Sequence, residues 1–130
     1  MKTLFSFLLS LLTLTVLSQA DFSQKVSNAL KAGDAATLAS LCMDQVELSI
    51  GGQDNIYTRE EAKKQLASFF SRNVAKSFVI RHEGTSKLDC QYRIGELTTS
   101  TGTYRVTFFM KKNGTQMQVK QLKIEAPDSN

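Results

Sequence analysis

The sequence predicts an α+β fold in which helices from the first half of the chain cover the concave face of a curved antiparallel sheet. Three observations carry this prediction. The second half contains four runs of alternating apolar and polar residues, the period of half-buried strands. The first half instead carries apolar residues at helical spacing in three segments. Turn sequences such as Asn113-Gly114, a strong hairpin signal, separate the four runs and favour antiparallel pairing.

Residues 1–20 are predicted to be a signal peptide rather than part of the fold. Met1-Lys2 gives a positive start, residues 4–17 form an apolar run, and Ser18-Gln19-Ala20 supplies small residues for cleavage before Asp21. An uncleaved membrane anchor is the alternative, but the run is short for a span that needs about 20 apolar residues. The protein is therefore expected to be exported, periplasmic or secreted, and free of the membrane after cleavage.

The mature chain is expected to form one domain, residues 21–126, followed by a polar tail at 127–130. Cleavage removes one of the 16 basic residues, which leaves a formal charge of +3 against the 12 acidic residues. This modest charge without a basic stripe argues against nucleic-acid binding. A single His and two distant Cys match no zinc spacing, so neither a metal nor a cofactor is expected.

The helices are predicted from apolar stripes and caps. Residues 21–31 form the first helix, which ends at Gly33, and Asp34 caps a second helix over 35–42. Thr58 and Glu61 form a capping box that opens the longest helix, residues 58–72. Phe69 and Phe70 give this helix a heavy apolar anchor.

One early strand and a four-strand meander are predicted to form the sheet. Residues 46–50 alternate as the early strand, residues 51–55 are expected to be a loop, and the meander covers 78–83, 88–94, 104–111 and 117–124. A bulge is expected at Gly95, and the three-residue step from Val119 to Leu122 predicts a second change of phase. The parity of the alternation assigns to the inner face Phe78, Ile80, His82, Leu88, Cys90, Tyr92, Ile94, Tyr104, Val106, Phe108 and Met110.

Cys42 and Cys90 are expected to be two free, buried thiols, because Cys is among the residue types most often buried. A single disulfide between them is the alternative, since export permits one.

Several stretches resemble a family of small exported bacterial proteins classed as a domain of unknown function, within the nuclear transport factor 2-like (cystatin-like) α+β cone superfamily. These stretches are 29–34 (ALKAGD), 46–48 (VEL), 76–78 (KSF), 92–99 (YRIGELTT) and 121–125 (QLKIE). The resemblance spans the mature chain. It implies a cone whose helices cover the concave side of the sheet and can leave a pocket open at one end. It carries no catalytic motif, because a fold does not fix a function.

The first functional hypothesis is a non-enzymatic binding protein whose cone holds a small apolar ligand or a protein partner, because the predicted inner face is rich in aromatic residues. The candidate ligand-binding residues are Phe69, Phe78, His82, Tyr92, Tyr104 and Phe108. The alternative is an isomerase or dehydratase-type enzyme in which His82 or Glu96 acts with Tyr92 or Tyr104. Neither His82 nor the tyrosines have a paired acid at a matching position, so no catalytic residue is assigned.

A third hypothesis is a structural dimer of the cell envelope. Val79, Phe109 and Leu97 are apolar at positions predicted to face outward, and an exposed apolar patch indicates a partner. Proteins that resemble this fold often dimerise through the outer sheet face, so a homodimer is favoured over a monomer.

Overall fold

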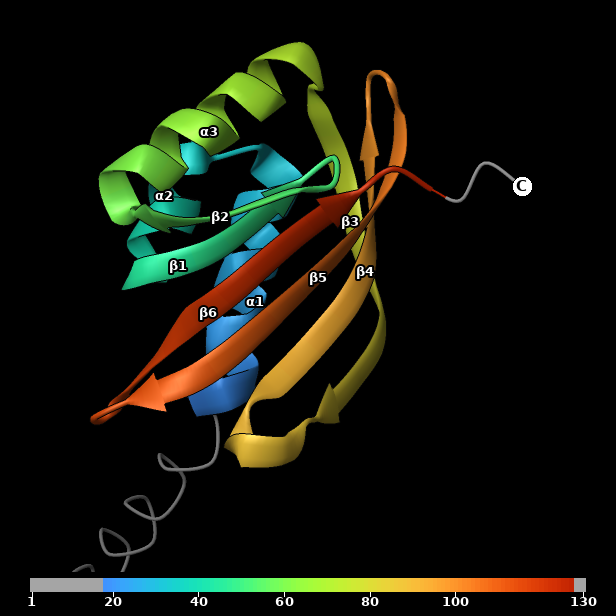
Figure 1. The fold of residues 1–130 in the computed structure, drawn as a ribbon. Coiled ribbons are helices and arrows are strands. Elements are labelled where there is room, and N and C mark those ends of the chain that lie inside the picture. Colours follow the sequence, from blue (N-terminus) through green and yellow to red (C-terminus); the bar gives the residue numbers. More distant parts are fainter. Residues whose placement is uncertain (1–17, 128–130) are drawn as a thin grey trace, which may run out of the picture.

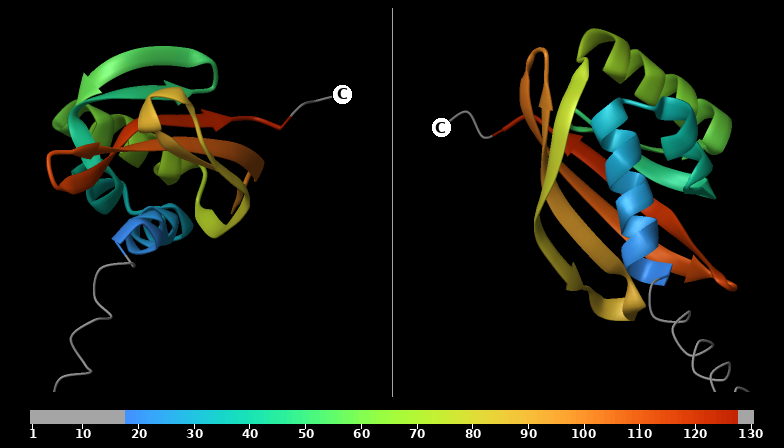
Figure 2. Two further views of the ribbon diagram at one scale, coloured as in Figure 1. Left: turned by 90° about the horizontal axis from the view of Figure 1, so that it is seen from below. Right: turned by 180° about the vertical axis from the view of Figure 1, so that it is seen from behind.

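The computed structural model describes residues 18–127, with side chains from residue 21 onward. The predicted signal peptide therefore lies almost wholly outside the described residues, as do the last three residues of the predicted tail. Figure 1 shows one strongly curved sheet, and Figure 2 shows the helices gathered on one side of it. This side is called the inner face below and the opposite side the outer face.

The three predicted helices are present. They are α1 (Ser18–Ala32), α2 (Ala35–Ser40) and α3 (Arg59–Arg72). The Asp34 side chain accepts a hydrogen bond from the backbone N–H of Thr37 and so caps α2 as predicted. The capping box of α3 is also confirmed, because the side chains of Thr58 and Glu61 each accept a hydrogen bond from the other residue's backbone. None of the helices in the described part of the chain is long and apolar enough to cross a membrane.

The sheet has six strands in the order β2-β1-β6-β5-β4-β3. Their bounds are β1 (Cys42–Ile50), β2 (Gln53–Thr58), β3 (Ala75–Thr85), β4 (Gln91–Thr99), β5 (Gly102–Asn113) and β6 (Gln116–Glu125), with a short 3₁₀ turn at Lys87–Asp89. The four-strand meander is confirmed as β3 to β6. The early strand is confirmed as β1.

Two details of the predicted sheet were wrong. Residues 53–55 belong to β2 rather than to a loop, because Gly51 and Gly52 have φ values of 60° and 85° and make a two-residue hairpin turn on their own. The polar residues of β2 resemble a loop in sequence because this strand is a largely exposed sheet edge. The sheet is also mixed rather than wholly antiparallel, since β1 runs parallel to β6.

The core forms between β5 and the helices, as predicted. Val106, Phe108 and Met110 are fully buried, and Tyr104 packs against the same cluster as Phe69 and Phe70 of α3. The predicted change of phase before Leu122 is confirmed. The β5–β6 register shifts between Phe109 and Met110, which keeps both Val119 and Leu122 in the core.

The predicted bulge at Gly95 is instead located on the neighbouring strand. The β4–β5 register is continuous through Gly95, but β3 pairs Ile80 with Gly95 and then His82 with Ile94, so Arg81 is the extra residue. Directly paired residues share a face of the sheet. The bulge therefore rotates His82 to the outer face, although Phe78 keeps its inner position.

The predicted parity of β4 was also wrong. Its inner positions are Arg93, Gly95 and Leu97, which pair with Phe108, Val106 and Tyr104 of β5. Tyr92 and Ile94 consequently face outward, and Leu97, expected outside, is fully buried. Leu88 and Cys90 precede the strand, and Leu88, which was expected inside, is 78% exposed because it lies in the 3₁₀ turn. The alternation was misleading because the outer positions of β4 are themselves apolar, whereas its inner positions include a charged residue and a glycine.

Candidate functional site: the outer face of the sheet

The interior of the cone is occupied by side chains. Phe108 is fully buried, Phe69 is 4% exposed, and both belong to one continuous core cluster. Phe78 is half-buried against this cluster, with its ring centroid 6.5 Å from that of Phe108. These three candidate ligand-binding residues are therefore brought together, but as packed core residues in contact with one another.

Tyr104 joins the sheet to the longest helix. Its ring lies edge-on to Phe69 with centroids 5.2 Å apart, and its hydroxyl donates a hydrogen bond to Asn73 Oδ1 at 3.0 Å. Asn73 in turn donates to the carbonyl of Phe69 at the end of α3. The Tyr104 hydroxyl thus fixes the C-terminus of α3 on the β4–β5 hairpin.

His82 and Tyr92, which were expected inside the cone, lie on the outer face. His82 is exposed in β3, and Tyr92 packs beside Phe109 of β5 with ring centroids 5.9 Å apart. The six candidate residues therefore do not form one site. Two of them belong to a different surface from the other four.

Glu96 also faces outward, because it pairs with Arg105 across β4 and β5. A cleft of about 400 Å³ on this side of the sheet is lined in part by His82, Glu96 and Tyr104. Two of the four groups named in the enzymatic alternative have partners of their own. Glu96 Oε2 lies 3.2 Å from a guanidinium nitrogen of Arg81, and the Tyr104 hydroxyl is donated to Asn73.

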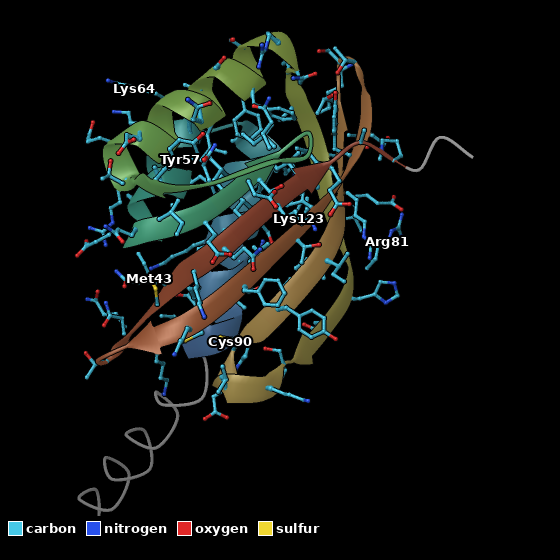
Figure 3. All side chains as sticks on the ribbon, viewed as in Figure 1. Met43, Tyr57, Lys64, Arg81, Cys90 and Lys123 are labelled. Carbon is cyan, nitrogen blue, oxygen red and sulfur yellow. The ribbon has the colours of Figure 1, made fainter. Side chains whose placement is uncertain are left out.

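A row of alternating charges crosses the outer face over four adjacent strands. In spatial order its members are Glu125, Arg105, Glu96 and Arg81, and we call them the charge row. Arg105 lies cross-strand between the two glutamates, and Arg81 closes the row by its ion pair with Glu96. In Figure 3, Lys123 and Arg81 are labelled on the face turned away from the helices. Sequence reasoning missed this row because its alignment depends on the register of four paired strands, and Arg81 joins it as the extra residue of the β3 bulge.

Apolar side chains lie beside the charge row. Tyr92, Ile94 and Phe109 are half-buried there, and Val79 is 46% exposed at the sheet edge. The outward apolar positions expected at Val79 and Phe109 are therefore present. Large apolar groups in contact on an otherwise polar face are typical of an interaction surface.

The two cysteines are free, as predicted, and both are buried. Cys42 belongs to the inner core cluster, and its Sγ donates a hydrogen bond to the carbonyl of Leu38. Burial raises the pKa of the Cys42 thiol from 9.0 to about 12, although the positive charge of Arg59 acts in the opposite direction.

The raised pKa of Cys42 predicts a loss of stability at alkaline pH. The folded protein keeps the thiol proton above pH 9.0, whereas the unfolded chain loses it, so the free energy of unfolding falls as the pH rises toward 12. The expected slope is about 1.4 kcal/mol per pH unit in excess of the slope of a Cys42→Ala variant. Urea unfolding of both proteins from pH 7 to 11 measures it, and parallel curves over this whole range would contradict the prediction.

Among the residues that the structure describes, His, Cys, Asp and Glu form no group of three or more that could hold a metal ion. The curved sheet with helices on its inner face has the fold of an α+β cone of the nuclear transport factor 2-like, cystatin-like type. A protein with a cystatin-like fold from Nostoc punctiforme has the same architecture, with a TM-score of 0.65 at 11% identity over 85% of this chain and 78% of that one.

The chain belongs to the family described as Domain of unknown function (DUF4783), whose model matches residues 23–125. A family protein of Bacteroides fragilis is 32% identical, with a TM-score of 0.72 over 78% of this chain and 94% of that chain. A second, from Bacteroides ovatus, is 28% identical, with a TM-score of 0.75 over 81% and 94%. No curated protein matches the chain.

Proposed function

We propose that this chain is an exported, non-enzymatic binding domain that associates with a second copy of itself through the outer face of the sheet. The apolar run at residues 4–17 supports export. The occupied cone favours a protein partner over a small apolar ligand, because Phe69 and Phe108 fill the space that a ligand would need. Binding is therefore assigned to the opposite side of the sheet.

The observation that carries this proposal is the order of signs in the charge row. From β6 to β3 the charges are negative, positive, negative and positive. A half-turn about an axis that runs along the strands between β4 and β5 reverses this order in a second copy. Every charge then faces its opposite. Arg105 meets the second copy's Glu96, and Glu125 meets the second copy's Arg81.

The same half-turn brings apolar groups together. Phe109 and Tyr92 lie on β5 and β4 at paired positions, so each would face the other residue type in the second copy. Thr107 and Ile94 form the neighbouring pair, and each would likewise face the other residue type in the second copy. Such a self-complementary patch is what a two-fold interface requires, and aromatic contacts at its centre are typical of the residues that dominate binding.

Reversing one charge in the row is expected to weaken the dimer strongly. Arg105→Glu would place two glutamates opposite each other twice, once on each side of the two-fold axis. Like charges across an interface cost several kcal/mol, which corresponds to a rise in the dissociation constant on the order of a hundredfold or larger. The measurement is sedimentation equilibrium of the protein purified after export, whose N-terminus is expected at Asp21.

The exchange variant Arg105→Glu/Glu96→Arg is the matched rescue, because it restores opposite charges between the copies and is expected to dimerise again. Lys64→Glu makes the same change of charge on α3, away from the sheet's outer face. It serves as the control and is expected to leave dimerisation unchanged. The proposal would be contradicted by a wild-type protein that is monomeric at every concentration. It would also be contradicted if Lys64→Glu weakened the dimer as much as Arg105→Glu does.

A further inference from the structure

One buried hydroxyl in the sheet has no hydrogen-bond partner among the described residues. Ser49 of β1 is 3% exposed, and its Oγ is unsatisfied. Ser27 Oγ is unsatisfied as well, but Ser27 lies in α1, where a serine hydroxyl can turn to the carbonyl of the preceding helical turn. The backbone carbonyls of β1 are directed to the neighbouring strands β2 and β6, so Ser49 lacks the option that a helix gives Ser27. An unpaired buried polar group in a folded protein requires an explanation, and a missing ligand is one.

Ser49 lines a cleft of about 470 Å³ on the outer face, over β2, β1 and β6. Asp54 lies directly cross-strand from Ser49, and Glu47 lies two positions before it on the same face. Ile56, which is 65% exposed, is the cross-strand neighbour of Glu47 and supplies an apolar wall. The remaining lining residues are Leu48, Asn55 and Gln121.

The residues that line this cleft include two carboxylates, Glu47 and Asp54, and no basic side chain. In the described part of the chain, neither Glu47 nor Asp54 takes part in an ion pair. Lys123, the neighbour of Ser49 on β6, lies with its amine 3.2 Å from the carboxylate of Glu125, which offsets its positive charge. Two free carboxylates and an unpaired hydroxyl beside an isoleucine favour a cationic group with several N–H donors on an aliphatic stem.

We propose that this cleft binds the ammonium end of an aliphatic primary amine. Ser49 Oγ accepts one of its hydrogen bonds, Glu47 and Asp54 balance its charge, and its methylene groups lie against Ile56. The amine is either a free alkyl diamine or a lysine side chain of another protein, because both present the same group. The cleft borders the proposed dimer surface at β6, but the residues assigned to bind the amine lie on β1 and β2, outside the charge row, so the two proposals are tested separately.

Amide chemical-shift titrations of the full processed protein test the site with three probes. They are 1,5-diaminopentane, Nα-acetyl-lysine methylamide and its Nε-acetylated form. Saturable shifts centred on Ser49, Asp54 and Gln121 are expected with at least one of the first two, and none with the acetylated compound, which lacks the charge. The diamine alone would indicate a free amine as ligand, and the lysine derivative would indicate a protein side chain.

Ser49→Ala and Asp54→Asn are each expected to weaken binding at least fivefold. Ser49→Ala also removes the unpaired hydroxyl, so its melting temperature without amine is expected to equal or exceed that of the wild type. Ser27→Ala is the matched control and is expected to bind normally, as is Arg105→Glu whatever its oligomeric state. Two results would overturn the proposal. One is the absence of saturable shifts with both amines, and the other is binding by the Ser49→Ala and Asp54→Asn variants that is as tight as that of the wild type.

Discussion

Phe108→Ala is expected to lower the free energy of unfolding by about 3–5 kcal/mol, the range found when a fully buried phenylalanine is truncated in a core that cannot collapse around the gap. Phe108 has no exposed surface and lies where β5 meets the helices. A residue that lined an empty ligand pocket would instead contact little on one side, and its truncation would cost much less. The measurement is urea unfolding followed by circular dichroism.

The neighbouring residue provides the matched control. Phe109→Ala removes the same atoms from the opposite face of the same strand, where the side chain is only half-buried beside Tyr92. Its expected cost is about 1 kcal/mol, in line with the smaller apolar area that it buries. Both variants are measured at a low, fixed protein concentration so that the proposed dimerisation does not add to the difference. Equal costs for the two truncations would contradict the filled cone.

The filled cone changes which function the domain can serve. The predicted pocket required the aromatic inner face to leave space, but Phe69 and Phe108 pack into one cluster with the neighbouring aliphatic side chains. Several groups on the outer face remain available to other molecules. They are the charge row, the Tyr92–Phe109 pair and the cleft around Ser49.

The sequence was sufficient for the parts of the fold that depend on local signals. The capping box at Thr58 and the N-cap at Asp34 use side chains within three residues of the groups they bond, so spacing alone predicted them. The inner face of β5 was predicted because Val106, Phe108 and Met110 alternate without interruption. The phase change before Leu122 was predicted because Met117 and Val119 alternate in one phase and Leu122 and Ile124 in the other, although both pairs were expected on the same face.

The candidate site was predicted less well because it depends on pairing between distant strands. The bulge that turns His82 outward arises where β3 meets Gly95 of β4, fifteen positions away from Ile80. Tyr92 was misplaced because the outer face is apolar enough to imitate a core face. In β2, one turn formed by Gly51 and Gly52 converts a polar stretch into an edge strand. Because residues of β2 form one side of the cleft around Ser49, an analysis that did not predict this strand could not predict the cleft.

Gly95→Ala is expected to lower the free energy of unfolding by about 1–3 kcal/mol, the usual cost of forcing extra volume into a packed site. A Cβ at this position would lie 2.5 Å from Cζ of Phe78 and 2.6 Å from the carbonyl oxygen of Val79. The ring of Phe78 crosses β4 at the one inner position that has no side chain. The carbonyl belongs to the backbone beside the bulge, so it cannot move without disturbing the β3–β4 pairing. Thermal and urea unfolding measure the loss.

Gly84→Ala is the matched control in the same sheet. A Cβ there would also make close contacts, 2.6 Å to the hydroxyl of Tyr92 and 2.7 and 2.9 Å to two of its ring carbons, but these atoms form the outer end of a side chain that can rotate away. Its expected cost is within about 0.5 kcal/mol, as for other surface substitutions. The double variant Gly95→Ala/Phe78→Ala separates the two contacts at Gly95. Because the Val79 carbonyl remains in place, its loss should exceed that of Phe78→Ala alone. Equal losses would mean that the ring, rather than the bulged backbone, requires glycine at this position.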